Sequence, residues 1–181
     1  MNKMIEVIEK KKINTLEVKA ELKMYHMPKF MRNVFPRIFE FMKAGGKEPT
    51  EAPYARYYNI DWKDVTTQSK LQMFLDVLRK KWRFSAGWPL KGRLEGKGNI
   101  VKGELPAGKF IKTIHKGPYR SVGESYKEMV NYAAKNKLIM EPESIEFYTN
   151  DPRKVDKKDI ETIILIPVKE KTAPVLRRHS K

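Results

Sequence analysis

Residues 103–168 limit the fold more than any other part of this sequence, because turn and capping residues divide them into short elements in a fixed order. Residues 109–115 alternate as a strand does, and Gly117-Pro118 then breaks the alternation. Ser121 follows as a favourable N-cap, and Glu124, three residues later, completes a capping-box pattern. The helix predicted to begin there buries a stripe formed by Val122, Tyr126, Met129, Val130 and Ala133.

Asn136 is the expected end of that helix, and two strand patterns follow at residues 145–149 and 162–168. A turn at Asn150-Asp151-Pro152 and a charged loop separate these strands, and Pro167 closes the second one. Residues 103–168 therefore predict a strand-helix-strand-strand unit.

The first half of the chain shows elements of the same kinds. Residues 13–23 alternate as a strand with one buried face, and apolar side chains recur at helical spacing over 27–42 before Gly45-Gly46 ends the run. Pro36 lies inside this run, so either the helix begins near Asn33 or, as we favour, a longer helix kinks at the proline.

The rest of this half predicts an aromatic strand over 53–59, a helix over 66–81 and a short strand over 82–88. Residues 91–103 carry glycines among charges, which predicts a turn-rich connection or a hairpin, rather than a packed element, between the two halves.

Short pieces of the two halves also match. YARYYNIDWKDV in the first half resembles IEFYTNDPRKVD in the second, and FSAGWPL resembles TIILIPV. Two such units normally pack about a pseudo-twofold axis, where a groove is a natural ligand site, although purely structural proteins also repeat this unit. We therefore predict an α+β fold of duplicated strand-helix-strand-strand units with a ligand cleft between them.

We expect the 181 residues to form a single domain of this kind. Its first repeat covers about 13–90 with the helical insertion near 66–81, its second covers about 103–168, and a basic tail follows at 169–181. The sequence has no cysteine and three histidines, which excludes a disulfide framework and a thiolate metal site and disfavours a histidine metal site. We expect no metal and no cofactor.

The chain shows no run of the roughly 20 apolar residues that a membrane span needs, and no signal peptide, so a cytoplasmic protein without a membrane partner is expected. Its net charge of +16 would attract nucleic acid. The basic residues are spread along the chain, however, and no nucleic-acid motif accompanies them, so a solvated lysine coat is the favoured interpretation.

Residues 103–129, GELPAGKFIKTIHKGPYRSVGESYKEM, resemble the signature of the GyrI-like (gyrase-inhibitor-like) small-molecule-binding domain. ESIEFYTNDP at 143–152 and ILIPV at 164–168 are similar to its Glu-x-Tyr strand and its closing strand. The same domain forms the effector-binding half of AraC-type and MerR-type multidrug regulators. The resemblance implies a small-molecule cleft in an α+β fold.

Two departures from the family pattern affect what can be transferred. The acidic residue that the family often has in the closing strand corresponds to Ile163 here, and Glu161, two residues earlier on the same face, is the alternative acid. The helical insertion at 66–81 is the second departure, and it could cover the cleft as a lid.

Four aromatic residues, Tyr57, Trp88, Tyr119 and Tyr148, are the candidate ligand contacts, because rings bury large areas and can stack on flat molecules. Half-buried strand aromatics are the plainer interpretation of each. Glu146 lies two residues before Tyr148 and therefore on the same strand face, which makes it the candidate acid of the site.

Glu146 could bind a cation or, with a raised pKa and Tyr148 beside it, activate water, as the resemblance to toxin-hydrolysing relatives implies. A surface glutamate paired with a lysine is the alternative. The resemblance implies a structural role for His115 in anchoring the turn at 116–118.

Fewer than about 25 residues precede the first-half strand, too few for a helix-turn-helix domain. A stand-alone binder of small hydrophobic or aromatic molecules, able to sequester drug-like compounds, is therefore the leading prediction. A hydrolase of electrophilic small molecules on the same scaffold, and a basic protein that binds nucleic acid or modulates gyrase, are the alternatives.

Overall fold

The structure is a computed structural model that describes residues 4–67 and 79–170. The strands are β1 (Ile5–Lys10), β2 (Ile13–Lys23), β3 (Tyr54–Tyr58), β4 (Lys81–Leu90), β5 (Val101–Leu105), β6 (Gly108–Lys116), β7 (Leu138–Met140), β8 (Glu143–Tyr148) and β9 (Glu161–Glu170). The helices are α1 (Met27–Ala44), α2 (Trp62–Thr67) and α4 (Val122–Lys135), and single 3-10 turns are η1 (Met24–His26), η2 (Tyr119–Ser121) and η3 (Lys157–Asp159).

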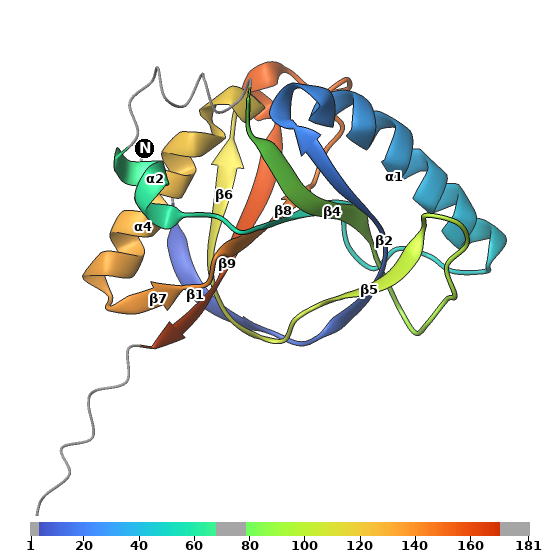
Figure 1. Cartoon of the computed structure of the whole chain (residues 1–181), viewed down its shortest axis with the longest axis horizontal. Helices are drawn as coiled ribbons and strands as arrows, with labels where there is room; N and C mark the ends of the chain where they lie inside the picture. The colour runs from blue at the N-terminus through green and yellow to red at the C-terminus, as the bar shows by residue number, and fades with distance from the viewer. Residues whose placement is uncertain (1–3, 68–78, 171–181) are drawn as a thin grey trace, which may run out of the picture.

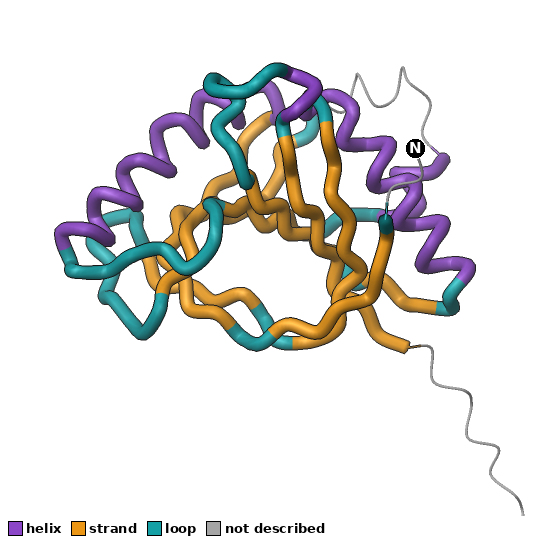
Figure 2. The backbone as a smooth tube through the Cα atoms, turned by 180° about the vertical axis from the view of Figure 1, so that it is seen from behind, coloured by secondary structure: helices purple, strands orange, loops and turns teal. Residues whose placement is uncertain are grey.

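The described strands form an antiparallel sheet in the order β1-β6-β9-β8-β3-β4-β2-β5, and β7 pairs with β9 at the end of this sheet. The sheet curves strongly, and the long helices lie on its convex face (Figure 1, Figure 2). α1 packs on β2 and β4, whereas α4 packs on β6 and against the short helix α2. The middle of the sheet, where β8 pairs with β3, lies between these two helix-covered halves.

Each long helix buries one stripe of apolar side chains. On α1, Val34, Ile38 and Met42 recur every four residues and are almost fully buried against β2 and β4. On α4, Met129 and Ala133 pack in the same way on a cluster of isoleucines from β6 and β9. Helix spacing in the sequence therefore fixes which helix faces meet the sheet.

The concave face has a core of its own. Its buried members come from β3, β5, β6, β8 and β9, and they are Tyr54, Leu105, Phe110, Ile145, Phe147 and Leu165. Because strand side chains alternate between faces, each central strand contributes to this core with one set of residues and to the helix-covered face with the other.

The predicted α+β class is confirmed, and so are the strand at residues 13–23 and the long helix that contains Pro36. A helix start near Asn33 is wrong, because α1 begins at Met27 with a proline in its first turn. Gly45 caps α1 as expected, and the following Gly46 has a φ of 66°, which glycine adopts without strain.

Ser121 directly precedes α4 as expected, but the capping-box prediction is wrong. Its hydroxyl donates to the carbonyl of Pro118 at 2.8 Å, and no side chain caps the helix. Three strands, β1, β5 and β7, were not predicted at all. Most of the predicted helical insertion at 66–81 and of the tail at 169–181 lies outside the described residues, while residues 169 and 170 belong to β9.

The central strand order β6-β9-β8-β3-β4-β2 is the order that two packed strand-helix-strand-strand units would give. The internal duplication, its boundaries and the single-domain organisation stay predictions. No helix in the described ranges is long and apolar enough to cross a membrane.

Candidate functional site

Glu146 is a buried carboxylate at the middle of the convex face. It lies on β8, its residue is 6% exposed, and its register partner on β3 is Ala55. Strand alternation directs Ser144, Glu146 and Tyr148 to the side that the helices cover. A carboxylate buried in this way needs hydrogen-bond donors, because burial without them costs several kcal/mol.

Tyrosine hydroxyls supply those donors. Tyr126 of α4 donates to Glu146 Oε1 at 2.7 Å, and Tyr148 donates to Oε2 at 3.1 Å. Behind them, the Tyr57 and Tyr148 hydroxyls are 3.1 Å apart, and the Tyr126 hydroxyl is 2.8 Å from Ser144 Oγ. An ionised carboxylate only accepts, so Tyr126 and Tyr148 direct their single protons to it and accept in turn from Ser144 and Tyr57. Two hydrogen-bond chains therefore converge on Glu146.

Burial and hydrogen bonding act on the pKa of Glu146 in opposite directions. Burial raises this pKa, the hydrogen bonds from Tyr126 and Tyr148 lower it, and the balance is a raised pKa. Burial foremost, together with the charge of Glu146, also holds the pKa of Tyr57 and Tyr126 well above its ordinary value. The tyrosines thus remain protonated donors at neutral pH, while the carboxyl group is easier to protonate than an exposed one.

Aromatic rings enclose this hydrogen-bonded centre. Phe35 of α1 lies 5.9 Å from Tyr148, and Tyr119 meets Tyr148 edge-on at 5.8 Å between ring centroids. On the other side, Trp62 of α2 lies 5.9 Å from Tyr126. Both long helices and both halves of the sheet therefore contribute side chains to one site around Glu146.

The structure brings four of the five predicted ligand contacts together. Glu146, Tyr148 and Tyr57 form the hydrogen-bonded centre, and Tyr119, which is 43% exposed, stands at its rim. Trp88 lies further from this centre, beyond the ring of Phe35. Its indole N–H donates to the carbonyl oxygen of Phe35 at 2.9 Å, and its ring packs under α1. The sequence reasoning missed Tyr126 as a site residue, having assigned it only to the buried stripe of α4.

Other predicted residues have different positions. His115 is buried, with Nδ1 2.8 Å from Ser125 Oγ and Nε2 3.3 Å from Ser121 Oγ, so it ties the end of β6 to the start of α4. Ile163 belongs to the concave core, and Glu161 shares that face and lies 3.7 Å from Lys116. Glu161 is thus on the opposite side of the sheet from Glu146 and does not replace an acid there.

A second buried carboxylate lies on the opposite, concave face of the sheet, and the sequence did not indicate it. Glu17 of β2 is 4% exposed and accepts a 2.6 Å hydrogen bond from the Tyr54 hydroxyl, which also contacts Thr15 Oγ1 at 3.0 Å. A Cβ at Gly103 would lie 2.4 Å from Glu17 Cδ, so the carboxyl group packs directly on the β5 backbone. This packing is the kind that a structural polar group makes.

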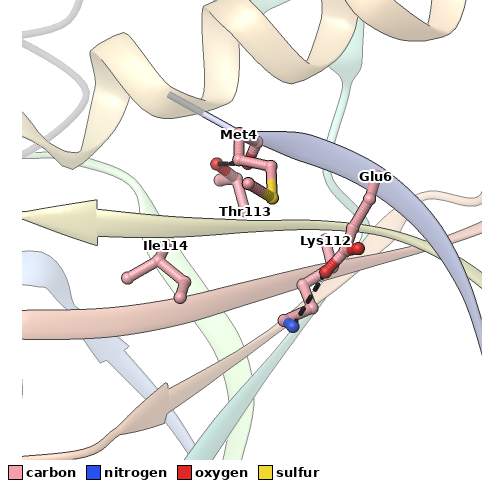
Figure 3. A pocket seen from close by; sticks show the side chains of 5 residues that line it. All are labelled: Met4, Glu6, Lys112, Thr113 and Ile114. Atoms are coloured by element: carbon pink, nitrogen blue, oxygen red, sulfur yellow. Dashed lines mark hydrogen bonds and ion pairs between the residues drawn. The ribbon is translucent and has the colours of Figure 1, made fainter. Parts of the chain in front are cut away.

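A surface hollow also occurs at the edge formed by β1 and β6 (Figure 3). Lys112 and Glu6 pair across it at 2.9 Å, and Thr113 donates to the carbonyl of Met4 at 3.0 Å. Its polar groups are thus already paired with one another. Across the residues that the structure describes, no three His, Asp or Glu side chains are grouped to hold a metal ion.

A curved antiparallel sheet with two long helices on one face places this protein in the α+β class. Residues 76–169 match the model of the GyrI-like small molecule binding domain, and the chain belongs to this family. No curated protein sequence matches it.

Solved structures share the fold. The EcmrR C-terminal domain superposes with a TM-score of 0.73 at 20% identity, covering 94% of this chain and 100% of that one. In the EcmrR–DNA complex the values are 0.72 and 20%, covering 93% of this chain and 58% of EcmrR, so this chain spans little more than half of that protein.

Two further similar structures are a hydrolase from Listeria innocua and the protein SAV2435 bound to tetraphenylphosphonium. The hydrolase has a TM-score of 0.63 at 13% identity, with 91% of each chain covered. SAV2435 has a TM-score of 0.55 at 10% identity, covering 92% of this chain and 94% of that one. At these identities the likeness concerns the fold.

Proposed function

We propose that this protein binds small hydrophobic or aromatic molecules at the site formed by Glu146, Tyr148, Tyr119 and the rings around them. One observation carries the proposal: in the described residues, the buried carboxylate of Glu146 is held by tyrosine hydroxyls and has no cationic partner. A binding site for flat apolar molecules needs rings for stacking and a few fixed polar groups for orientation, and this site has both.

The predicted duplication supports the same place. The matched tyrosines Tyr57 and Tyr148 are 91 residues apart, and the same offset relates Ala55 to Glu146, which are register partners in the sheet. A pseudo-twofold axis that exchanged the halves would therefore pass through the Ala55–Glu146 pair. We infer that the ligand sits over this axis, with its polar group directed to the half that carries the acid.

The ligand reaches Glu146 from the side of Tyr148. The bond from Tyr148 to the carboxylate is the longer of the two, and its ring lies between Phe35 and the half-exposed Tyr119. Rotation of Tyr148 would free Oε2 and open a slot between these rings, while Tyr126 would still hold Oε1. A cation or a hydrogen-bond donor attached to an aromatic group fits such a slot, because the carboxylate can only accept.

Tetraphenylphosphonium is a suitable first probe, since it is an aromatic cation and SAV2435, which shares the fold, is bound to it. Titration calorimetry and thermal shift should show binding and a rise in Tm, because a ligand of the native state stabilises it by mass action. Triphenylphosphine oxide, neutral and similar in shape, should bind at least about tenfold more weakly, a difference of about 1.4 kcal/mol.

Glu146→Gln should reduce the affinity for tetraphenylphosphonium by about tenfold or more and leave the affinity for the neutral compound nearly unchanged. Tyr58→Phe is the matched control, because the Tyr58 hydroxyl contacts Ser85 on the concave face, away from Glu146. No shift in Tm with any member of a broad panel of aromatic cations and neutral compounds would refute the proposal.

Hydrolysis of an electrophilic small molecule on the same site is the second candidate. The observation that favours it is a carboxyl group with a raised pKa beside two tyrosine donors, the set that can take a proton from water and stabilise a developing oxyanion. Here Glu146→Gln should abolish turnover of a strained epoxide or cyclopropane substrate while the affinity remains. Turnover that survives this substitution would remove Glu146 from the mechanism.

A further inference from the structure

The exposed part of the β2–β4 pair carries a basic surface on its concave face. The register places Lys23 opposite Lys81 and Glu21 opposite Arg83, and Lys19 follows two residues along β2. Strand alternation directs these five side chains to the face that α1 does not cover, since Leu22, Phe84 and their neighbours face the helix. We call Lys19, Lys23, Lys81 and Arg83 the basic strand face.

The positive charge of this surface is not neutralised within the described residues. None of the four basic side chains forms an ion pair there, and Glu21 is the single acid among them. Lys23 and Lys81 are direct cross-strand neighbours, and like charges in such a pair destabilise a sheet. Other cations of the sheet are paired, as Arg56 is with Glu143 at 2.7 Å. Charge repulsion that lowers the stability of the fold, and that no other contact offsets, is typical of a binding surface.

The strand edge beside these residues is also open. β5 pairs with β2 only from Ile13 to Glu17, so the part of β2 that carries Lys19 and Lys23 has one free edge in the described structure. This end of β2 lies next to the beginning of β4 and the start of α1 (Figure 1). An extended anionic chain could therefore run along the edge without meeting another strand.

Aromatic rings flank the basic strand face. Tyr25, the second residue after β2, is 50% exposed. Its ring centroid lies 4.2 Å from that of His26, and the Lys23 ammonium lies 5.8 Å from its ring. Tyr58 of β3 lies on the same sheet face, with the guanidinium of Arg56 5.2 Å from its ring. Exposed rings beside cations are the arrangement on which unpaired bases stack.

We propose that the basic strand face binds single-stranded nucleic acid, with phosphates on Lys19, Lys23, Lys81 and Arg83 and a base on Tyr25. From Lys19 to Lys23 the strand spans about 13 Å, which matches two to three nucleotides of an extended strand. A duplex offers no unpaired base to Tyr25. A membrane surface is disfavoured because, apart from Tyr25, the two most exposed large apolar residues lie at the other half of the sheet: Met4 directly before β1, and Ile139 on β7.

The surface is separate from the small-molecule site, because the sheet lies between the basic strand face and Glu146. The two proposals therefore stand independently. A domain that binds a small molecule on one face and nucleic acid on the other could transmit ligand binding to the nucleic acid that it holds.

The test measures binding of fluorescein-labelled oligo(dT) and oligo(U) by fluorescence anisotropy at several salt concentrations. Replacing the four basic residues by Gln should weaken binding by about tenfold or more and reduce the magnitude of the log affinity–log salt slope by about 3, since each phosphate contact on a single strand contributes about 0.7. Tyr25→Ala should weaken binding to both single strands by about fivefold and leave binding to duplex DNA unchanged.

The control removes the same amount of charge elsewhere, from four exposed lysines on α4 and near η3, namely Lys127, Lys135, Lys157 and Lys158. Both quadruple variants have a net charge four units below +16, so unspecific attraction falls equally in both. Equal loss of binding in the two variants, equal affinity for single strands and duplex, or tighter binding to phosphatidylserine vesicles than to either oligonucleotide would overturn the proposal. Cooperative urea unfolding with a midpoint no lower than that of the wild type establishes that both variants fold.

Discussion

Tyr148→Phe is the substitution that tests the hydrogen bonds around Glu146 most directly. It leaves the ring and its contacts with Phe35 and Tyr119 in place and removes one hydroxyl. The loss has two parts. Glu146 loses one of its two tyrosine donors, and the hydroxyl of Tyr57 loses its partner.

The magnitude follows from those two parts. A hydrogen bond to a charged group contributes about 1.5–3 kcal/mol, and a stranded hydroxyl costs about 1 kcal/mol more when the site is not fully dry. We expect a loss of about 2.5–4 kcal/mol at neutral pH, and a Tm lower by about 5–16 °C for a chain of this size.

The loss should depend on pH with a definite sign. The hydrogen bond from Tyr148 lowers the pKa of Glu146 in the folded protein, so its removal raises that pKa and leaves the unfolded value unchanged. A lower folded pKa stabilises the ionised state, so the advantage of the wild type is complete where Glu146 is ionised and shrinks as pH falls toward the ordinary glutamate pKa of about 4.3.

Urea unfolding at pH 4 to 8 measures both effects, and a double-mutant cycle with Tyr57→Phe isolates the relay. Tyr57→Phe alone removes a neutral hydrogen bond and should cost about 1 kcal/mol. In the background of Tyr148→Phe it removes the stranded hydroxyl and should restore about 1 kcal/mol, which gives a coupling of about 2 kcal/mol. If the stability losses of the two substitutions were additive and independent of pH, Tyr57 and Tyr148 would not form a hydrogen-bond chain that ends at an ionised Glu146.

Three further predictions concern the same sheet. The buried hydroxyl of Thr162 has no hydrogen-bond partner among residues 4–67 and 79–170, so Thr162→Val should raise the free energy of unfolding by about 1 kcal/mol in urea titrations. A loss of stability would indicate a polar partner there. A Cβ at Gly87 would lie 2.2 Å from the carbonyl oxygen of Leu16, so Gly87→Ala should destabilise by about 3 kcal/mol, and a neutral result in the same assay would show that β2 can shift away. Because burial raises the pKa of Tyr57 and Tyr126, these side chains stay protonated in the folded protein above a pH of about 10, and the free energy of unfolding falls as the pH rises further. Absorbance at 295 nm should show that they ionise only when the protein unfolds. Ionisation before unfolding would contradict their burial.

The elements that the sequence predicted are those with a periodic buried face. β2 and α1 bury long stripes on each other, so their spacing in the sequence is regular and their bounds were predictable. β1 and β5 are the edge strands, which pair on one side only and carry lysine and glutamate among few apolar residues. They are strands because they pair with a neighbouring strand, and the local sequence does not indicate this pairing.

The candidate site was predictable only in part for a related reason. Glu146 and Tyr148 share a strand face by simple alternation, so their proximity followed from the sequence. Tyr126 reaches them from a helix 20 residues away along the chain, and its spacing indicated burial without indicating what its hydroxyl would contact. A tyrosine in an otherwise apolar helix stripe is the signal that could have identified it, because a buried hydroxyl requires a partner.

The absence of a cation beside Glu146 within the described residues is informative in a chain with 38 lysines and arginines. Glu143, three residues earlier on the same strand, faces the concave side and receives two guanidinium nitrogens of Arg56. Two further acids are paired as well, Glu6 of β1 with Lys112, and Glu51, which precedes β3, with Lys10. Several partly buried acids are thus paired with cations, whereas the two buried carboxylates in the described ranges, Glu17 and Glu146, are held by tyrosine hydroxyls, which are neutral donors. Glu17 packs on the β5 backbone at Gly103, as a structural polar group does. Glu146 instead lies beside Tyr148, whose ring neighbour Tyr119 is half-exposed, and this difference supports the proposal that the charge of Glu146 is kept for a ligand.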